Sequence, residues 1–142
     1  MPQAAPLLCV LKKNSKLRTV IDTRQHNDNT VKDVTPLPDQ EIIREDVVQA
    51  RYQSKIDLAD AYKQVQVQPE DVPKMAFSTI AGTYVSNVVQ QGDCNAPATF
   101  QRLMTLIFRD VIGRFLHVYL DNIFIYSDSI EEHEKYLKLV FD

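Results

Sequence analysis

Residues 115–127 read FLHVYLDNIFIYS, and this stretch decides the fold. Two apolar runs, FLHVYL and IFIYS, flank the polar pair Asp121 and Asn122. Both residues of the pair tolerate positive φ, so the pattern predicts two strands joined by a type I′ turn with this pair at its tip. A turn of this kind needs no function. A carboxylate beside buried strands can also bind a metal ion, and the local residues leave both interpretations open.

Helices are predicted on either side of this hairpin. Ser129, followed three residues later by Glu132, forms a capping box that opens a last helix. Its apolar face is expected to comprise Tyr136, Leu137, Val140 and Phe141. Upstream, apolar residues recur at three and four positions from Asn95 to about Val111, which predicts a second helix. Asn95 is expected to cap that helix, and Pro97 suits its first turn.

The first 90 residues favour short strands. Residues 7–12 and 17–22 predict a hairpin with a basic tip, and residues 75–79 and 83–89 predict another. A helix is expected over about residues 39–49, strands over 52–57 and 63–69, and a short helical or turned piece between those strands. Hairpins interspersed with helices indicate an α+β fold whose antiparallel sheet is covered on one face.

Composition is ordinary for a globular protein: 142 residues, 44% hydrophobic, 25% charged, net charge −3. No apolar run approaches the roughly 20 residues that span a membrane, and the N-terminus lacks the pattern of a secretory signal. We therefore expect an intracellular protein, cytoplasmic or nuclear, without a membrane partner. In such a compartment Cys9 and Cys94 are expected to be free thiols. Two isolated cysteines also give no metal-ligand spacing, which favours a structural role for both.

Positive charge gathers near the N-terminus. Asp22 is the single acidic residue between Lys12 and Arg24, in a segment that also carries Lys13, Lys16 and Arg18. This segment is a local candidate for binding phosphates, although a solvated hairpin face would look the same.

Four motifs occur in order along nearly the whole chain. They read KKNSKLRTVIDTRQHND, SKIDLADAYKQVQVQPED, QQGDCNAPATFQRLM and FLHVYLDNIFIYSDSIEEHEKYLKLVF. Together they resemble the reverse transcriptases of gypsy-type LTR retrotransposons, and among those the fungal elements. The resemblance implies a single fingers-and-palm domain over residues 1–142, with the fingers part at about 1–50 and the palm part at 51–142.

The resemblance also implies a metal site. Asp57 and Asp121 match the family's catalytic aspartates, and Leu58 matches a residue that lends its backbone carbonyl to an ion. Nucleotidyl transfer uses two divalent ions about 3.5–4 Å apart, and Mg²⁺, or Mn²⁺, is the implied cofactor. Taken alone, Asp57 could equally be a helix cap.

Positions that contact the nucleotide and the template follow from the same resemblance. Tyr62 matches the aromatic gate that excludes a ribose 2′-hydroxyl, although alone it would read as a core tyrosine. Cations matching those that contact the incoming triphosphate are Arg18 and either Lys12 or Lys13. Asp60 and Ala61 match positions whose amides face the triphosphate, Gln91 and Gly92 match the nucleotide pocket, and Asn95, Ala96 and Pro97 open the template-facing helix.

Two departures from the family pattern matter. Asn122 stands where the family has a second hairpin aspartate, so the two-ion site is expected to be weakened. The matched region also lacks the thumb, connection and RNase H portions, whose loss would weaken the grip on primer–template.

These observations predict an RNA-directed DNA polymerase domain fragment that acts on deoxynucleotides and an RNA or DNA primer–template. Its activity is expected to be impaired, and a partner chain could supply the missing regions. A second interpretation is a non-catalytic descendant that binds nucleic acid or a protein partner. A third is a translated relic without a selected function.

Overall fold

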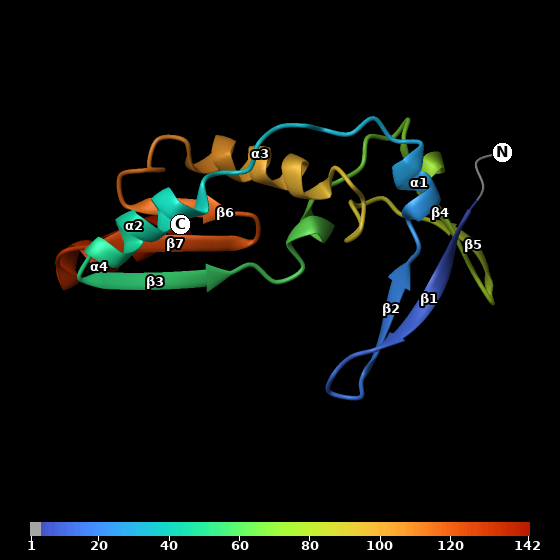
Figure 1. Cartoon of the computed structure of the whole chain (residues 1–142), viewed down its shortest axis with the longest axis horizontal. Helices are drawn as coiled ribbons and strands as arrows, with labels where there is room; N and C mark the ends of the chain where they lie inside the picture. The colour runs from blue at the N-terminus through green and yellow to red at the C-terminus, as the bar shows by residue number, and fades with distance from the viewer. Residues whose placement is uncertain (1–3) are drawn as a thin grey trace. The chain divides into compact units, whose positions relative to one another are not determined.

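The computed structural model describes residues 4–142, which form seven strands, four α-helices and two 3₁₀ turns (Figure 1). The strands are β1 (Ala5–Leu11), β2 (Leu17–Ile21), β3 (Tyr52–Asp57), β4 (Ala76–Thr79), β5 (Gly82–Val85), β6 (Leu116–Tyr119) and β7 (Asn122–Ser127). The helices are α1 (Arg24–Asp28), α2 (Gln40–Gln49), α3 (Ala96–Phe108) and α4 (Ile130–Phe141), and the 3₁₀ turns are Ala61–Gln64 and Val72–Met75. The α+β prediction is confirmed.

The chain divides into two compact units, each assembled from two separate segments. The first unit comprises Met1–Asp33 and Tyr62–Ala96, and the second comprises Val34–Ala61 and Pro97–Asp142. The division near residue 50 into a fingers part and a palm part stays a prediction.

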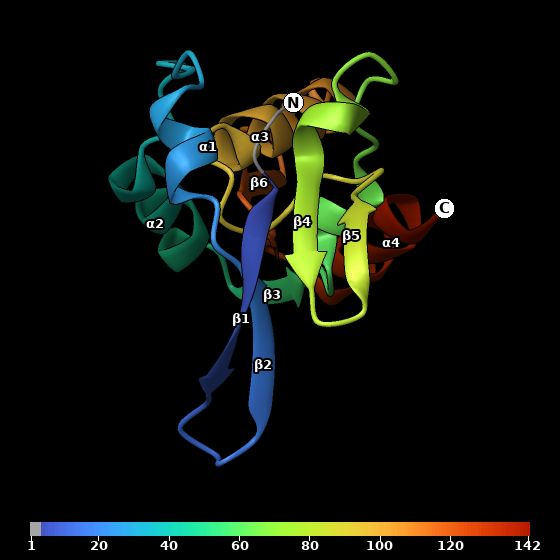
Figure 2. The same ribbon diagram turned by 90° about the vertical axis from the view of Figure 1, so that its right-hand side faces the viewer.

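The first unit contains a mixed four-stranded sheet in the order β2-β1-β4-β5 (Figure 2). β1 and β2 form the predicted basic hairpin, with Leu7 opposite Ile21 at its open end. β4 and β5 form the second predicted hairpin. A short parallel pairing joins the two hairpins, with Ala5 opposite Phe77.

Two parts of the first unit differ from the sequence-based predictions. The strand predicted over residues 63–69 is wrong, because these residues make a single antiparallel bridge between Gln66 and Val88. Alternating valine and glutamine suits a strand, but regular pairing does not extend beyond this bridge. α1 was not predicted, since its five residues, RQHND, carry no apolar periodicity.

The second unit contains an antiparallel three-stranded sheet in the order β3-β7-β6. Leu116 of β6 and Ile125 of β7 lie opposite each other and are completely buried. The register places Ser54 of β3 opposite Ile125, so these three residues share one face of the sheet.

α4 packs on this face through a buried histidine. His133 bonds on one side to Ser54 Oγ, 2.8 Å from Nε2, and on the other to Ser127 Oγ, 2.8 Å from Nδ1. The rings of Phe115 and Tyr136 stack nearby with centroids 3.9 Å apart. These contacts fix α4 across β3 and β7.

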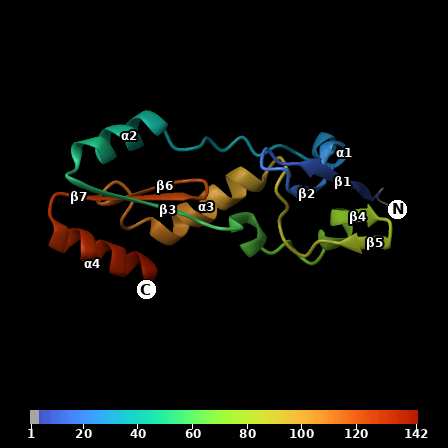
Figure 3. The same ribbon diagram turned by 90° about the horizontal axis from the view of Figure 1, so that it is seen from below.

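α2 packs on the opposite face, so the prediction that one face is covered is wrong (Figure 3). Asp46 of α2 lies 2.7 Å from Nε2 of His117, whose ring stacks on Tyr126. His117 pairs with Phe124 in the register and therefore points away from the Leu116 face. Burial raises the pKa of the Tyr126 hydroxyl, and the neighbouring Asp46 carboxylate adds to this shift.

The helix ends follow local chemistry. The Asp39 carboxylate caps α2 by accepting a hydrogen bond from the Glu41 amide at 2.8 Å, and the Ser129 hydroxyl caps α4 by accepting one from the Glu132 amide at 3.3 Å. α3 ends at Phe108, three residues before the predicted end. Phe141, predicted on the apolar face of α4, is 71% exposed.

Candidate functional site

The turn between β6 and β7 consists of Leu120 and Asp121, because Tyr119 and Asn122 already pair across the strands. Leu120 has a φ of 53°, whereas Asp121 and Asn122 do not adopt positive φ. The predicted type I′ turn centred on Asp121 and Asn122 is therefore wrong by one residue. Positive φ at the first turn position alone is the pattern of a type II′ turn.

Asp57 and Leu58 lie beside this turn within the second unit. Asp57 ends β3 directly opposite Asn122, and its side chain is exposed. The Leu58 amide donates a hydrogen bond to the Asp121 carbonyl oxygen at 2.8 Å. Residues that are remote in sequence, Asp57 and Asp121, thus come from adjacent strand ends.

Asn122 is held against Asp121. Its Nδ2 atom donates to Oδ1 of Asp121 at 3.2 Å, and its own Oδ1 atom is buried without a hydrogen-bond partner. A buried oxygen that accepts nothing is costly unless some other group binds it.

The side chains at this turn offer the type of donor atom that a hard divalent cation prefers. Such cations prefer oxygen ligands, and the site offers the carboxylates of Asp57 and Asp121 and the unpartnered amide oxygen of Asn122. Within residues 4–142, no three His, Cys, Asp or Glu side chains gather as a metal cluster, and here the third oxygen donor is an amide.

Gln101 is a residue that the sequence did not single out. It lies on α3, is buried to 5% exposure, and its side-chain amide bonds both Val118 and Leu120 of the hairpin. A glutamine on a helix gives no sequence signal for such a role, because both partners lie beyond the end of that helix.

The stretch after Asp57 turns sharply. Asp60 has a φ of 51°, and buried Ala61 begins the first 3₁₀ turn. Tyr62 is half-buried, and its carbonyl oxygen accepts from the Val65 amide at 3.1 Å. The nucleotide roles expected of these three residues stay predictions.

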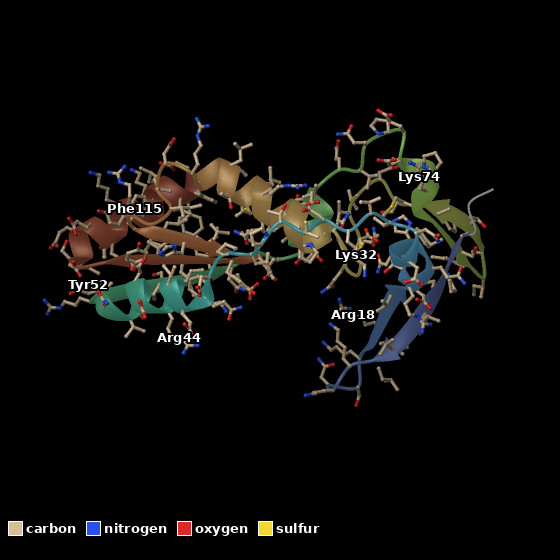
Figure 4. The ribbon with its side chains drawn as sticks, turned by 45° about the horizontal axis from the view of Figure 1, so that its top comes forward. Arg18, Lys32, Arg44, Tyr52, Lys74 and Phe115 are labelled. Atoms are coloured by element: carbon tan, nitrogen blue, oxygen red, sulfur yellow. The ribbon has the colours of Figure 1, made fainter. Side chains whose placement is uncertain are left out.

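The basic hairpin of the first unit exposes Lys12 and Lys13 near its tip. Arg18 projects from β2 (Figure 4). Its guanidinium donates a hydrogen bond to Oε1 of Gln91. Two residues that the resemblance assigned to the nucleotide, Arg18 and Gln91, are therefore neighbours within this unit.

Gly92 is fixed by two residues that the sequence analysis missed. Its carbonyl oxygen accepts hydrogen bonds from Thr23 Oγ1 at 2.9 Å and from Asn27 Nδ2 at 2.8 Å. Gly92 has a φ of 117°, and a Cβ atom there would lie 3.2 Å from Thr23 Oγ1. Glycine suits this position for both reasons. Beside it, burial raises the pKa of the Asp93 carboxyl.

Arg24 forms an ion pair, whereas no carboxylate of the described residues pairs with Lys12, Lys13, Lys16 or Arg18. The Arg24 guanidinium contacts both carboxylate oxygens of Asp22, at 2.8 and 2.6 Å. These hydrogen bonds lower the pKa of Asp22 from 3.8 to about 2. The candidate phosphate-binding set is therefore Lys12, Lys13, Lys16 and Arg18.

Asn95 bonds the chain preceding α2. Its Oδ1 atom accepts from the Asp33 amide, and its Nδ2 atom donates to the Val31 carbonyl, both at 2.8 Å. The amide expected to cap α3 thus joins two distant segments of the first unit. Ala96 is buried at the start of α3, with Pro97 next to it.

Sequence relatives identify the family. Residues 10–142 match the model of reverse transcriptase (RNA-dependent DNA polymerase). The chain belongs to the reverse transcriptase family. The Pol polyprotein from transposon 297 of Drosophila melanogaster is 39% identical over 145 residues, covering 99% of this chain and 14% of that protein. The Pol polyprotein from transposon gypsy of the same fly is 30% identical over 145 residues, covering 98% of this chain and 14% of that protein. The chain is thus similar to the reverse transcriptase domain of LTR-retrotransposon Pol and spans only 14% of these relatives.

Solved structures agree with this assignment. The foamy viral protease-reverse transcriptase in complex with RNA/DNA hybrid has a TM-score of 0.85 and 25% identity, covering 99% of this chain and 19% of that one. The reverse transcriptase fold is therefore shared along nearly the whole chain.

No helix among the described residues is long and apolar enough to cross a membrane.

Proposed function

We propose that this chain is the fingers-and-palm portion of a gypsy-type reverse transcriptase, from a fungal element, and that it carries the chemical centre of an RNA-directed DNA polymerase. The gathering of Asp57, Leu58, Asp121 and Asn122 at one turn carries the proposal. In the reaction, a primer 3′-hydroxyl oxygen attacks the α-phosphorus of a deoxynucleoside triphosphate, and pyrophosphate leaves.

Asp57 and Asp121 are the proposed cation ligands, with the backbone carbonyl of Leu58 as a further oxygen. Two divalent cations, Mg²⁺ or Mn²⁺, would supply charge that favours the 3′-alkoxide and the leaving pyrophosphate. The chain's part is to hold these oxygens at fixed strand ends, where the β3–β7 register sets Asp57 against the hairpin.

The other residues matched by the resemblance are proposed to bind the substrate. Arg18, with Lys12 or Lys13, would contact the triphosphate, and Gln91 and Gly92 would line the nucleotide pocket. The hydrogen bond between Arg18 and Gln91 supports a shared role for those two residues. The amides of Asp60 and Ala61 would face the triphosphate, Tyr62 the sugar, and Asn95, Ala96 and Pro97 the template.

Nucleic acid is the proposed partner. The foamy viral enzyme with a similar fold was solved with an RNA/DNA hybrid and with dsDNA. An RNA or DNA primer–template is accordingly the proposed substrate here, and a partner chain is a further proposed partner.

Primer extension tests the proposal. A DNA primer on an RNA template is incubated with deoxynucleotides in Mg²⁺ or Mn²⁺, using the wild-type chain, Asp57→Ala and the distant surface variant Asp142→Ala as a matched control. Extension that disappears in Asp57→Ala and persists in Asp142→Ala is the expected result. Extension that is equal in all three would refute a role for Asp57.

A second candidate function is nucleic-acid binding without catalysis. Asn122 favours it, because an amide there removes one negative charge from the cation site. This function requires that Asp57→Ala bind a labelled duplex as tightly as wild type, while neither protein extends a primer. Retained binding without extension would therefore select the second candidate.

A further inference from the structure

The side chain of Gln101 forms hydrogen bonds with the backbone of the hairpin that carries Asp121. We propose that Gln101 is a positioning residue that holds the Leu120–Asp121 turn in the conformation needed for cation binding; this inference rests on the proposed function. The residue lies on α3, outside the four residues gathered at the turn, and is 5% exposed.

The Gln101 amide makes a donor and an acceptor contact to the hairpin backbone. Its Oε1 atom accepts from the Leu120 amide at 2.7 Å, and its Nε2 atom donates to the Val118 carbonyl at 3.1 Å. A longer contact, 3.4 Å, joins Nε2 to Thr105 Oγ1 one helical turn away. A primary amide of this length can accept on one side and donate on the other, which neither a carboxylate nor a thioether can do.

The turn needs such support because of Leu120. Its φ of 53° lies in the left-handed region, where the Cβ atom of an L-residue crowds the following carbonyl oxygen, and the first position of a type II′ turn is usually glycine. A strained residue persists only where its surroundings over-determine its conformation. Gln101 binds the Leu120 amide on the α3 side, and the Leu58 amide binds the Asp121 carbonyl on the β3 side.

Release of Gln101 would free the turn but not the strands. Asp57 and Asn122 are fixed by the β3–β7 register, whereas Leu120 and Asp121 lie outside the paired strands. A relaxed Leu120 would move the Asp121 carboxylate relative to the other oxygens. Displacements of about 1 Å are enough to impair sites of this kind.

Three variants separate positioning from general packing. Gln101→Met keeps the length of the side chain and removes both hydrogen-bonding functions. Gln101→Glu keeps the acceptor for the Leu120 amide and loses the donor to Val118. Thr105→Val, one turn along α3, is the matched control, because it removes only the longest of the three contacts.

Two measurements are made on each variant, in the wild-type and in the Asn122→Asp background. Amide hydrogen exchange at Leu120, followed by NMR, reports the turn itself. Mn²⁺ binding, followed by water-proton relaxation well below the unfolding temperature, reports the cation site. The bond to the Leu120 amide is the one that holds the turn residue, and losing one buried hydrogen bond changes an equilibrium about tenfold. Gln101→Met should therefore exchange Leu120 about tenfold faster and bind Mn²⁺ about tenfold more weakly.

Gln101→Glu should fall between Gln101→Met and wild type in both measurements, and Thr105→Val should match wild type. Unchanged Leu120 exchange in Gln101→Met would overturn the inference, because the turn would not depend on Gln101. Faster exchange with unchanged Mn²⁺ affinity would also overturn it, leaving a structural role only. A chain that binds no Mn²⁺ in either background refutes the proposed function itself, whereas Leu120 exchange still decides whether Gln101 holds the turn.

Discussion

Replacing Asn122 with aspartate should make the stability of the protein depend on divalent cations. The Nδ2 atom of Asn122 donates to Asp121 at 3.2 Å, so Asn122→Asp replaces an attractive contact with two carboxylates at about the same separation. Without cations the variant should be less stable than wild type. With cations it should be more stable, because the added charge becomes a ligand.

The magnitude follows from the contact distance and the burial. Two like charges about 4 Å apart repel by about 1 kcal/mol in water and about 4 kcal/mol at an effective dielectric constant of 20. Asp121 and Asn122 are half-buried, so we expect an intermediate cost of about 2 kcal/mol in the free energy of unfolding. For a chain of this size, that lowers the Tm by about 4–8 °C. A cation at about 100 times its Kd returns roughly 2.7 kcal/mol, which exceeds the loss.

The assay is thermal unfolding at pH 7, in chelator and then across a Mg²⁺ or Mn²⁺ titration, with calorimetric titration of the same ions. Asn14→Asp, on the β1–β2 turn, is the matched control for an added charge away from the site. Combining Asn122→Asp with Asp57→Asn tests whether the two strand ends share the ion.

Two results would refute the reasoning. Equal stability of Asn122→Asp and wild type in chelator would mean that no charge repulsion exists at the turn. A cation-dependent gain that survives Asp57→Asn would mean that the ion binds elsewhere, and the reverse transcriptase assignment would then describe ancestry without a metal site.

Three further predictions concern the first unit. Arg18→Ala should weaken binding of a labelled duplex and reduce the dependence of log K on log salt concentration by about one phosphate contact. Arg24→Ala should do neither, because Arg24 is paired with Asp22. Equal slopes for the two variants in an anisotropy titration would contradict this. Tyr62→Ala should admit ribonucleotides in primer extension, and unchanged discrimination would remove Tyr62 from the sugar contact. The pKa of Asp22 is lowered from 3.8 to about 2, so its stabilisation is present above pH 3.8 and is lost as pH falls through about 2. Arg24→Ala should raise that pKa toward 3.8, measured by carboxyl ¹³C titration, and a titration that stays near 2 would be inconsistent with the pairing.

The elements that the sequence predicted well are those with a local signal. The β6 and β7 strands are apolar runs, and the α2 and α4 starts carry Asp39 and Ser129 as caps. These signals need no knowledge of the rest of the chain. The proposed catalytic aspartates, Asp57 and Asp121, were picked out by ordered motifs. Local chemistry alone would not have distinguished them from turn and cap residues.

The contacts that were missed join residues far apart in sequence. Leucine has no preference for positive φ, so the strained Leu120 could not be read from its neighbours, and its support comes from Gln101 on another element. Asn95 was expected to cap its own helix, but its amide bonds residues 31 and 33. His133 reads as a polar helix residue, yet Ser54 and Ser127 enclose it.

The interleaving of the two units has a consequence for synthesis on the ribosome. β1 cannot pair with its parallel neighbour β4 until Phe77 has been synthesised. β3 cannot pair with β7 until the chain has been synthesised beyond Asn122. Early translation products therefore expose unpaired strand edges, which are prone to aggregate. Contacts this distant also slow folding, since a long loop must close before they form. Premature termination after α3 would leave the second unit without β6 and β7, so the order of its segments makes this sheet sensitive to truncation.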